Sequence, residues 1–282
     1  MTEELAAEAC YRHEKRETYI HCQRCERPIC IDCQTPGAVG VLCPSCVHPG
    51  GTSRDNRRRT RARRGELPTV TVTLIAISAV IFVLQWIPGL DVTGWLLFAP
   101  VYSLGEYSVA VPYEPWRMVT SIFVHSTSFL LHILLNMYTL WVFGQVLESM
   151  LGRARFLLLF LISGLGGSVA VMYLGAPQTG VVGASGAIFG LLGAFLVIQR
   201  RLGGDSTQLL VLVGINLVIG FLPGMSISWQ AHVGGLVTGL VLGLIFMSTR
   251  RPQQQQRQWL LIGLTALALI VLVVSRSPLL IG

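Results

Sequence analysis

Apolar residues gather in long runs over the second part of the chain, from about residue 70 to the C-terminus. Seven runs follow one another, at about 70–88, 128–148, 155–175, 184–200, 207–223, 228–248 and 258–275. Each is close to the roughly 20 residues with which an α-helix crosses a bilayer. Because backbone groups inside a membrane must be paired within the protein, the pattern predicts seven transmembrane helices and an all-α polytopic membrane protein.

Charges in the loops between these runs predict the orientation of the helices. With a cytoplasmic N-terminus, nearly all the basic residues of the loops lie on the inner side: Arg153, Arg155, Arg200, Arg201, Arg250, Arg251 and Arg257. Cytoplasmic loops of membrane proteins carry such an excess of Lys and Arg. An odd number of spans then places the C-terminus outside.

Seven arginines between Arg54 and Arg64 directly precede the first run. Such a cluster can bind nucleic acid, but its position beside a span favours a juxtamembrane segment that attracts anionic lipid. We therefore expect the lipid bilayer, and no nucleic acid, as its partner. The chain is 52% hydrophobic and 12% charged, which excludes a soluble globular protein for most of its length. Its Arg-rich, Lys-poor composition favours a bacterial cell membrane.

The seven cysteines all precede the first run, and together with one histidine they form four pairs of C-x2-C or C-x2-H spacing. These eight residues are Cys10, His13, Cys22, Cys25, Cys30, Cys33, Cys43 and Cys46. Eight nitrogen and sulfur ligands match two tetrahedral zinc sites. A cytoplasmic location and an odd number of cysteines argue against disulfides. Because so short a unit has few apolar residues, we expect metal to supply much of its folding energy.

This cysteine-rich stretch resembles a B-box-type zinc finger, in which the pairs cross-brace. The resemblance implies one zinc on Cys10, His13, Cys30 and Cys33, and a second zinc on Cys22, Cys25, Cys43 and Cys46. Sequential pairing remains open, and His21 and His48 are spare candidate ligands. Four protein ligands leave no open position on zinc, so both ions are expected to be structural. The unit is expected to bind a protein partner.

Four polar residues inside the predicted helices lie at a similar depth, near the outer face. His132 and Asn136 fall in the second run, Ser185 begins the fourth, and His232 lies one turn into the sixth. Polar and ionisable groups at membrane depth are costly and mark functional sites by default. Each residue alone is compatible with ordinary helix packing, but their common depth indicates a single site.

The chemistry of these four residues is that of acyl transfer. His232 can take the proton of the Ser185 hydroxyl, and Asn136, His132 and the Ser185 amide can stabilise an oxyanion. With no carboxylate at this depth, a Ser–His dyad is predicted. Glycines at four-residue spacing in the fourth and sixth runs would let these two helices approach closely. Phe189 lies one turn below Ser185 and is placed to stack on the His232 ring.

Five stretches resemble motifs of the rhomboid intramembrane serine proteases. They are GASGAIFG at 183–190, AHVGG at 231–235, HILLN at 132–136, PWR at 115–117 and ESMLGRARF at 148–156. The resemblance covers about residues 70–250 and implies six core helices around a water-filled cavity open to the outside. It also implies structural roles for Arg117 and Glu148. The seventh predicted helix and the zinc unit are additions to this core.

The resemblance implies Ser185 as nucleophile, His232 as general base, and Asn136, His132 and the Ser185 amide as the oxyanion hole. Substrates of the family are transmembrane segments of other proteins, cut near the outer face without a cofactor. We expect four parts in the chain: a zinc-binding domain at 1–50, an Arg-rich linker at 51–69, the protease core at 70–250, and a linker with the seventh helix at 251–282.

Two other functions remain open on the sequence alone. A membrane-protein chaperone or adaptor of the same fold would bind spans without cutting them and would not need Ser185, which this chain keeps. A transporter is disfavoured, because the predicted helices show neither a carboxylate at membrane depth nor an internal repeat.

Overall fold

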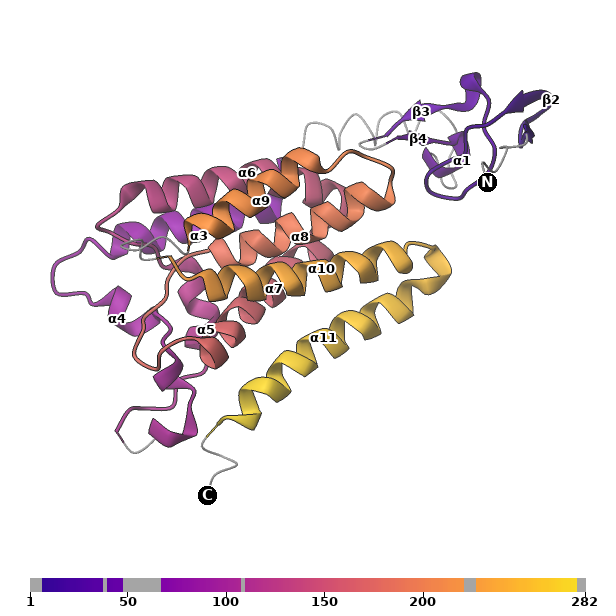
Figure 1. Ribbon diagram of the computed structural model, residues 1–282. Coiled ribbons are helices and arrows are strands. Elements are labelled where there is room, and N and C mark those ends of the chain that lie inside the picture. Colours follow the sequence, from indigo (N-terminus) through magenta and orange to yellow (C-terminus); the bar gives the residue numbers. More distant parts are fainter. Residues whose placement is uncertain (1–6, 38–39, 48–66, 108–109, 221–226, 278–282) are drawn as a thin grey trace.

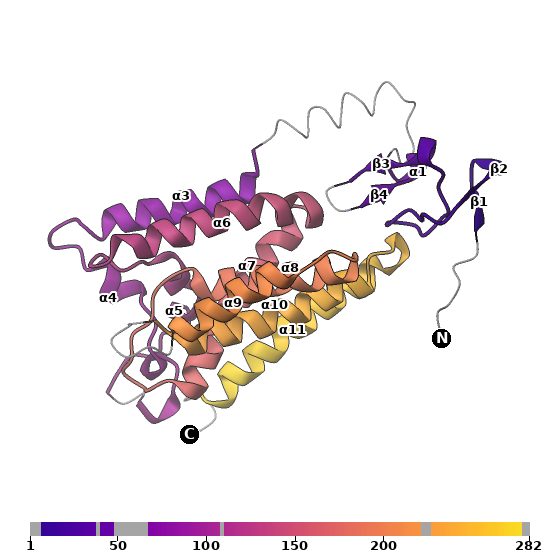
Figure 2. The same ribbon diagram turned by 45° about the horizontal axis from the view of Figure 1, so that its top comes forward.

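The computed structural model describes residues 7–37, 40–47, 67–107, 110–220 and 227–277, which form a helical bundle and a small cysteine-rich unit (Figures 1 and 2). Most of the predicted Arg-rich linker, the spare ligand candidate His48 and the end of the fifth predicted run lie outside these residues.

Every predicted run contains a helix. These are α3 (Thr69–Leu84), α6 (Leu130–Leu151), α7 (Arg153–Leu174), α8 (Ser185–Arg201), α9 (Thr207–Ile219), α10 (Trp229–Ser248) and α11 (Gln255–Ser275). Among the described residues, four helical stretches are long and apolar enough to cross a membrane: α6, α7, α10 and Pro252–Ser275, which contains α11 and the preceding turn η5 (Pro252–Gln254). The prediction of an all-α polytopic membrane protein is confirmed.

Helix α8 is the central helix of the bundle, and it packs most closely against α10 and α7. Glycines allow the approach to α10, because a Cβ on Gly235 would collide with the Gly186 carbonyl, and one on Gly239 with the Gly190 carbonyl. On the other side of α10, a Cβ on Gly167 of α7 would lie 2.8 Å from the Ala231 carbonyl oxygen. The small-residue spacing seen in the sequence thus brings backbones into contact.

The segment between α3 and α6 folds over the end of the bundle at which α3 ends and α6 begins. It contains α4 (Val92–Leu96), η2 (Pro100–Tyr102), η3 (Gly105–Tyr107), α5 (Arg117–Thr120) and η4 (Ser121–Phe123). Arg117 is buried within it, bonds the carbonyl oxygens of Gly94 (2.6 Å) and Leu97 (3.2 Å), pairs with Glu114, and lies over the Tyr102 ring. These contacts join distant parts of the segment, as expected of a structural residue.

Helix α11 is fastened to the bundle at both ends. At its start, Arg155 Nε donates to Gln258 Oε1 (2.6 Å), and Gln258 in turn donates to Thr249 Oγ1 (2.8 Å). At its end, the Tyr173 hydroxyl donates to the Leu272 carbonyl oxygen (2.9 Å). The seventh helix therefore packs along α7 and α10, outside the six others.

The cysteine-rich unit is built from very short elements. Strands β1 (Glu8–Cys10) and β2 (His13–Thr18) pair antiparallel, as do β3 (Thr35–Pro36) and β4 (Val41–Leu42), and η1 (Ile31–Cys33) and α1 (Pro44–Val47) complete the unit. Its buried hydrophobic cluster consists of five cysteines and a single larger apolar side chain, Ile29. Such a core is too small to hold the unit together by apolar burial.

One face of this unit contacts the turn between α10 and α11. Arg250 donates to the Gln23 carbonyl oxygen (3.3 Å) and pairs with Glu26, whose second oxygen lies 3.6 Å from Arg251 Nη2. The unit therefore lies beside the end of the bundle that carries the basic loops (Figure 1).

Glu148, near the end of α6, caps the N-terminus of α3. Its buried carboxylate accepts from the backbone amides of Val70 (3.0 Å) and Thr71 (2.8 Å) and from the Thr71 hydroxyl (2.8 Å). These amides belong to the first turn of α3, where no intrahelical acceptor exists. The carboxylate also faces the positive end of the α3 dipole.

We expect Glu148→Ala to lower the free energy of unfolding by about 2–3 kcal/mol, because it leaves buried donors without an acceptor. Thermal unfolding of the purified protein in detergent measures this as a lower Tm. The neighbouring change Ser149→Ala is the matched control, since the Ser149 hydroxyl is exposed and bonds only the Val146 carbonyl of its own helix. Equal Tm values for the two variants would contradict the role given to Glu148.

Candidate functional site

Ser185 is the first residue of α8, and the chain reaches it through a sharp turn. Gly183 has φ +120°, a backbone conformation that side-chain-bearing residues rarely adopt, and Ala184 is fully buried. As one of the first residues of the helix, Ser185 has a backbone amide without an intrahelical acceptor. That amide lies at the positive end of the α8 dipole. The turn therefore presents both the hydroxyl and an amide donor at one place.

His232 lies in the first turn of α10 and is buried, with 6% of its surface exposed. Its ring stacks on Phe189 at a centroid distance of 4.1 Å and an interplanar angle of 12°. The expected stacking is therefore present, and it places His232 over the face of α8 that carries Ser185, one turn away. The glycine contacts between α8 and α10 hold the two helices at this separation.

Within the described residues, no hydrogen bond joins Ser185 Oγ to His232, and His232 Nδ1 is buried without a partner. Long or absent hydrogen bonds are common between catalytic groups when no substrate is bound, so this geometry does not exclude such a pair. Among the described residues, no carboxylate is bonded to His232 either.

The His132 ring and the Ser185 amide lie on either side of Gly183. A Cβ on Gly183 would lie 2.8 Å from both Nε2 and Cε1 of His132 and 3.9 Å from the Ser185 nitrogen. A side chain at this position would therefore collide with the His132 ring. Glycine lets the ring edge that carries Nε2 lie near the Ser185 amide.

Asn136 lies one turn deeper in α6 than His132 and is buried. Its Nδ2 donates to the His132 carbonyl oxygen (2.7 Å), and its Oδ1 is buried without a partner in the described structure. The side chain thus bonds its own helix, as polar residues in apolar surroundings often do. An amide nitrogen carries two hydrogens, so a second hydrogen remains for another acceptor.

The sequence analysis overlooked His125, which precedes α6. It is fully buried, its Nδ1 lies 3.2 Å from the Phe123 carbonyl oxygen, and its ring centroid is 5.3 Å from that of His132. Burial, and to a lesser extent the neighbouring His132, lower the pKa of His125 to about 4, so the ring is neutral at physiological pH. The only signal in the sequence was a histidine seven residues before His132, outside the apolar runs.

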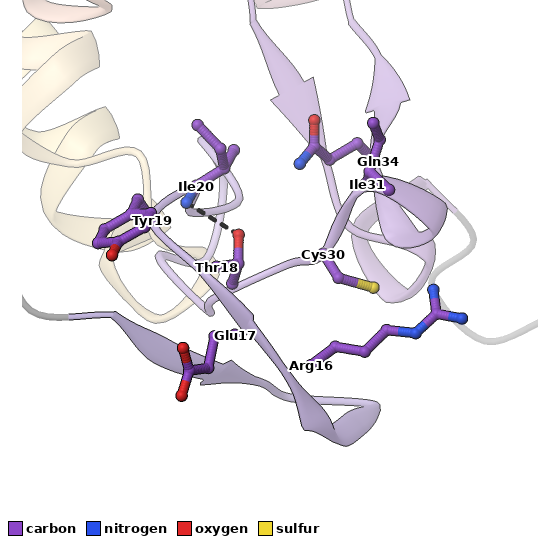
Figure 3. A pocket seen from close by; sticks show the side chains of 8 residues that line it. All are labelled: Arg16, Glu17, Thr18, Tyr19, Ile20, Cys30, Ile31 and Gln34. Carbon is purple, nitrogen blue, oxygen red and sulfur yellow. Dashed lines mark hydrogen bonds between the residues drawn. The ribbon is translucent and has the colours of Figure 1, made fainter.

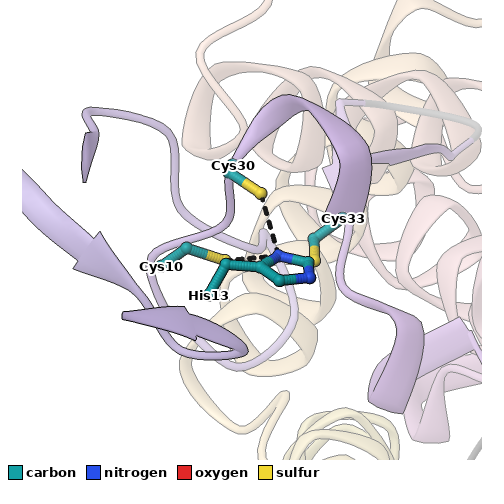
Figure 4. Close-up of side chains that lie close together, drawn as sticks. All are labelled: Cys10, His13, Cys30 and Cys33. Atoms are coloured by element: carbon teal, nitrogen blue, oxygen red, sulfur yellow. Dashed lines mark hydrogen bonds between the residues drawn. The ribbon is translucent and has the colours of Figure 1, made fainter. Parts of the chain in front are cut away.

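The cysteine-rich unit holds two groups of four potential metal ligands. Within each group, all ligand atoms lie within 4.8 Å of one another, and the groups are Cys10, His13, Cys30 and Cys33, and Cys22, Cys25, Cys43 and Cys46. These are the cross-braced sets. Figure 4 shows the first group, whose four side chains point toward one another.

The spacing of the ligand atoms fits zinc. His13 Nδ1 lies 3.9, 3.3 and 3.4 Å from the sulfurs of Cys10, Cys30 and Cys33. With zinc–sulfur and zinc–nitrogen bonds of about 2.3 and 2.0 Å, a tetrahedral site has a ligand separation of about 3.6 Å. Among divalent metals, zinc is the one that a tetrahedral set of thiolate and imidazole donors usually binds.

One thiol in each group has a lowered pKa. Burial raises the pKa of Cys10, but backbone N–H groups, above all that of Cys30, outweigh this and lower the pKa to about 6. The same balance lowers the pKa of Cys22 to about 6, with the Cys43 amide as its main donor. The thiolate is the form that binds metal, so the backbone of the unit favours binding before an ion arrives.

The cysteine-rich unit also carries an open groove of about 630 Å³ (Figure 3). Its lining residues are Arg16, Glu17, Thr18, Tyr19, Ile20, Cys30, Ile31 and Gln34. Tyr19 and Ile31 are strongly exposed, at 61% and 80%. Exposed apolar groups of this kind are consistent with the partner expected for the unit.

Comparison with known protein families matches residues 112–249 to the Rhomboid domain. The chain is 34% identical over 184 residues to "Putative rhomboid protease YdcA" of Bacillus subtilis, an alignment that covers 63% of this chain and 88% of that protein. It is also 34% identical over 193 residues to "Rhomboid protease GluP" of Bacillus subtilis, covering 66% of this chain and 37% of the relative.

The chain is also similar to a plant protein. "RHOMBOID-like protein 1" of Arabidopsis thaliana is 39% identical over 159 residues, covering 54% of this chain and 39% of that protein. This chain therefore spans well under half the length of GluP and of RHOMBOID-like protein 1. The Rhomboid match begins after the cysteine-rich unit and ends before α11.

Double substitutions test the pairing of the metal ligands. We expect the full chain to carry two zinc ions, measured by elemental analysis of the purified protein. Cys10→Ser with Cys30→Ser should leave one zinc, because both residues belong to one cross-braced group. Cys30→Ser with Cys43→Ser should leave none, since it damages both groups. Sequential pairing predicts the reverse result for the two variants, and His21→Ala is a control that should keep both ions.

Proposed function

The chain belongs to the rhomboid family, and on this premise we propose that it is an intramembrane serine protease that cleaves transmembrane segments of other proteins. Ser185 is the nucleophile and His232 the general base of a catalytic dyad. The observation that carries the proposal is that His132 Nε2 and the Ser185 amide both lie close to Gly183, at the start of α8.

The reaction follows from these positions. His232 takes the proton of the Ser185 hydroxyl as the oxygen attacks the scissile carbonyl. The carbonyl oxygen, now negative, accepts hydrogen bonds from the Ser185 amide and His132. When the carbon–nitrogen bond breaks, His232 gives its proton to the leaving amine. Water then attacks the acyl-enzyme by the same route and releases the carboxylate.

Two contacts support His232 in this role without a carboxylate. Stacking on Phe189 restricts rotation of the ring, and the glycine contacts between α8 and α10 keep the two helices together. Both restraints act before substrate arrives and therefore reduce the entropy lost in reaching the reactive geometry. Asn136, with one hydrogen still available on Nδ2, is a third oxyanion donor in this proposal.

Cleavage takes place near the outer face of the cell membrane. The orientation rests on the basic loops and on the cysteine-rich unit, which lie at the end of the bundle opposite Ser185. A cytoplasmic N-terminus and an outer C-terminus satisfy the charge distribution. A helical substrate must first expose its scissile carbonyl, because helical amides are shielded and already bonded. Substrates with helix-destabilising residues near the outer face are therefore preferred.

The cysteine-rich unit forms a cytoplasmic zinc-binding domain at 1–50 that resembles a B-box and binds a protein partner. Its two zinc ions are structural, and catalysis needs no cofactor. Residues 51–69 form the Arg-rich linker, 70–250 the protease core, and 251–282 the linker and seventh helix.

Proteolysis by purified protein in liposomes tests the dyad. Wild type should cleave a single-span substrate and react with a fluorophosphonate probe. Ser185→Ala and His232→Ala should each lose at least roughly 10³-fold in kcat/KM, because neither member of the dyad works alone. Residual cleavage by Ser185→Ala at the wild-type rate would falsify the proposal. Silence of all three proteins, with intact binding of the substrate, would instead favour a non-catalytic chaperone or adaptor.

Gly183→Ala tests the oxyanion donors separately from the dyad. The added methyl group would collide with the His132 ring, at 2.8 Å from Nε2. We expect kcat to fall by roughly 10–10³-fold with little change in KM, as when an oxyanion donor is lost. Gly203→Ala is the matched control, because Gly203 also has a positive φ (+77°) but its Cβ would meet nothing within 4 Å. Equal kcat values in the two variants would place the oxyanion elsewhere.

A further inference from the structure

The short segment from Ser121 to Ser126 supports both of the groups that lie close to Gly183. At its start, the Ser121 carbonyl oxygen accepts from the Gly183 amide (3.0 Å). At its end, the Ser126 amide donates to His132 Nδ1 (3.2 Å). The position of this segment therefore influences the turn before Ser185 and the ring of His132 together.

The bond from Ser126 determines which nitrogen of His132 carries the proton. A backbone amide can only donate, so His132 Nδ1 must accept and carries no hydrogen. The neutral ring then has its proton on Nε2, the nitrogen that lies close to Gly183. A hydrogen bond to one ring nitrogen thus makes the other nitrogen a donor toward the oxyanion.

Gln85, just past the end of α3, holds this segment in place. Its Nε2 donates to the His125 carbonyl oxygen (2.8 Å), and its Oε1 accepts from the His125 amide (3.2 Å). The side chain thus pairs with the backbone on both sides of His125, directly before Ser126. Its Nε2 also donates to Thr93 Oγ1 in α4 (2.8 Å), so all three polar contacts restrain the same amide group.

We propose that Gln85 is a positioning residue for His132: by pairing with the His125 backbone it holds the Ser126 amide against Nδ1, and so keeps His132 as an Nε2–H donor to the oxyanion. The expected effect of Gln85 on catalysis rests on the proposed protease function. The expected position of the proton on the His132 ring does not depend on that function. Gln85 touches no reacting atom and acts only through the segment that it binds.

The kinetic test is a double-mutant cycle in the full chain. Gln85→Leu keeps a similar size but removes all three contacts, and it should lower kcat by roughly tenfold, less than loss of the whole His132 donor. In the His132→Ala background the same change should have almost no further effect, because the two residues act through one interaction. A general loss of folding would lower kcat in both backgrounds equally.

Thr93→Val is the matched control for the cycle. It removes one partner of Gln85 but leaves both bonds to the His125 backbone, so kcat should change by less than about twofold. If Thr93→Val and Gln85→Leu are equally impaired, the contact with α4 is what matters and the proposal is wrong. A tenfold loss for Gln85→Leu in the His132→Ala background also overturns it.

Nitrogen NMR of the ¹⁵N-histidine-labelled protein tests the tautomer without any substrate. The His132 signals are assigned by comparison with His132→Ala, and the inactive Ser185→Ala protein serves as the parent. We expect a hydrogen on Nε2 and none on Nδ1, and a shift toward mixed tautomers in Gln85→Leu. A hydrogen on Nδ1 in the parent, or no change in Gln85→Leu, overturns the proposal.

The kinetic and NMR measurements together distinguish an error in the role of Gln85 from an error in the proposed protease function. A protein without proteolysis that shows the expected NMR shift supports the control of His132 by Gln85 and counts against the protease. Cleavage abolished by Ser185→Ala, together with an NMR signal unaffected by Gln85→Leu, supports the protease and overturns the role of Gln85.

Discussion

The contact between the backbones of α8 and α10 is the constraint on which the site depends. Gly235 and Gly239 lie against the carbonyl groups of Gly186 and Gly190, where no side chain would fit. Apolar burial does not drive such contacts inside a bilayer, because lipid is as apolar as the helix surface. Close packing of small residues replaces it. Ser185 and His232 each lie within one turn of this contact.

The helices and the stacked pair of Phe189 and His232 were accessible from the sequence because they depend on local periodicity. Seven apolar runs predicted the helices to within a few residues, and the four-residue step from Ser185 to Phe189 predicted the ring stacked on His232. The sequence did not predict the hydrogen bond of Asn136 within its own helix, the burial of His125 or the hydrogen bonds of Gln85 with the His125 backbone. The last two depend on an irregular loop, whose path no periodic pattern encodes.

In the cysteine-rich unit, too, the sequence indicated the local pairs but not which distant pairs lie together in the fold. Pair spacing identified eight candidate ligands, but a pair spaced by two residues does not indicate which other pair it joins. The folded chain brings Cys10 and Cys30 into one group and Cys22 and Cys43 into the other. Among the described residues of the unit, Ile29 is the single larger buried apolar one, so bound metal would have to provide much of the stability that a core provides in other domains.

Helix α11 covers one flank of the bundle. It lies along α7 and α10 and is bonded to the bundle through Gln258 at one end and Leu272 at the other. A protein with one membrane span encounters others by diffusion in two dimensions, so a covered flank removes part of the perimeter from productive encounter. For a protease of this architecture, the added helix would act as a steric filter on collisions, without touching a reacting atom.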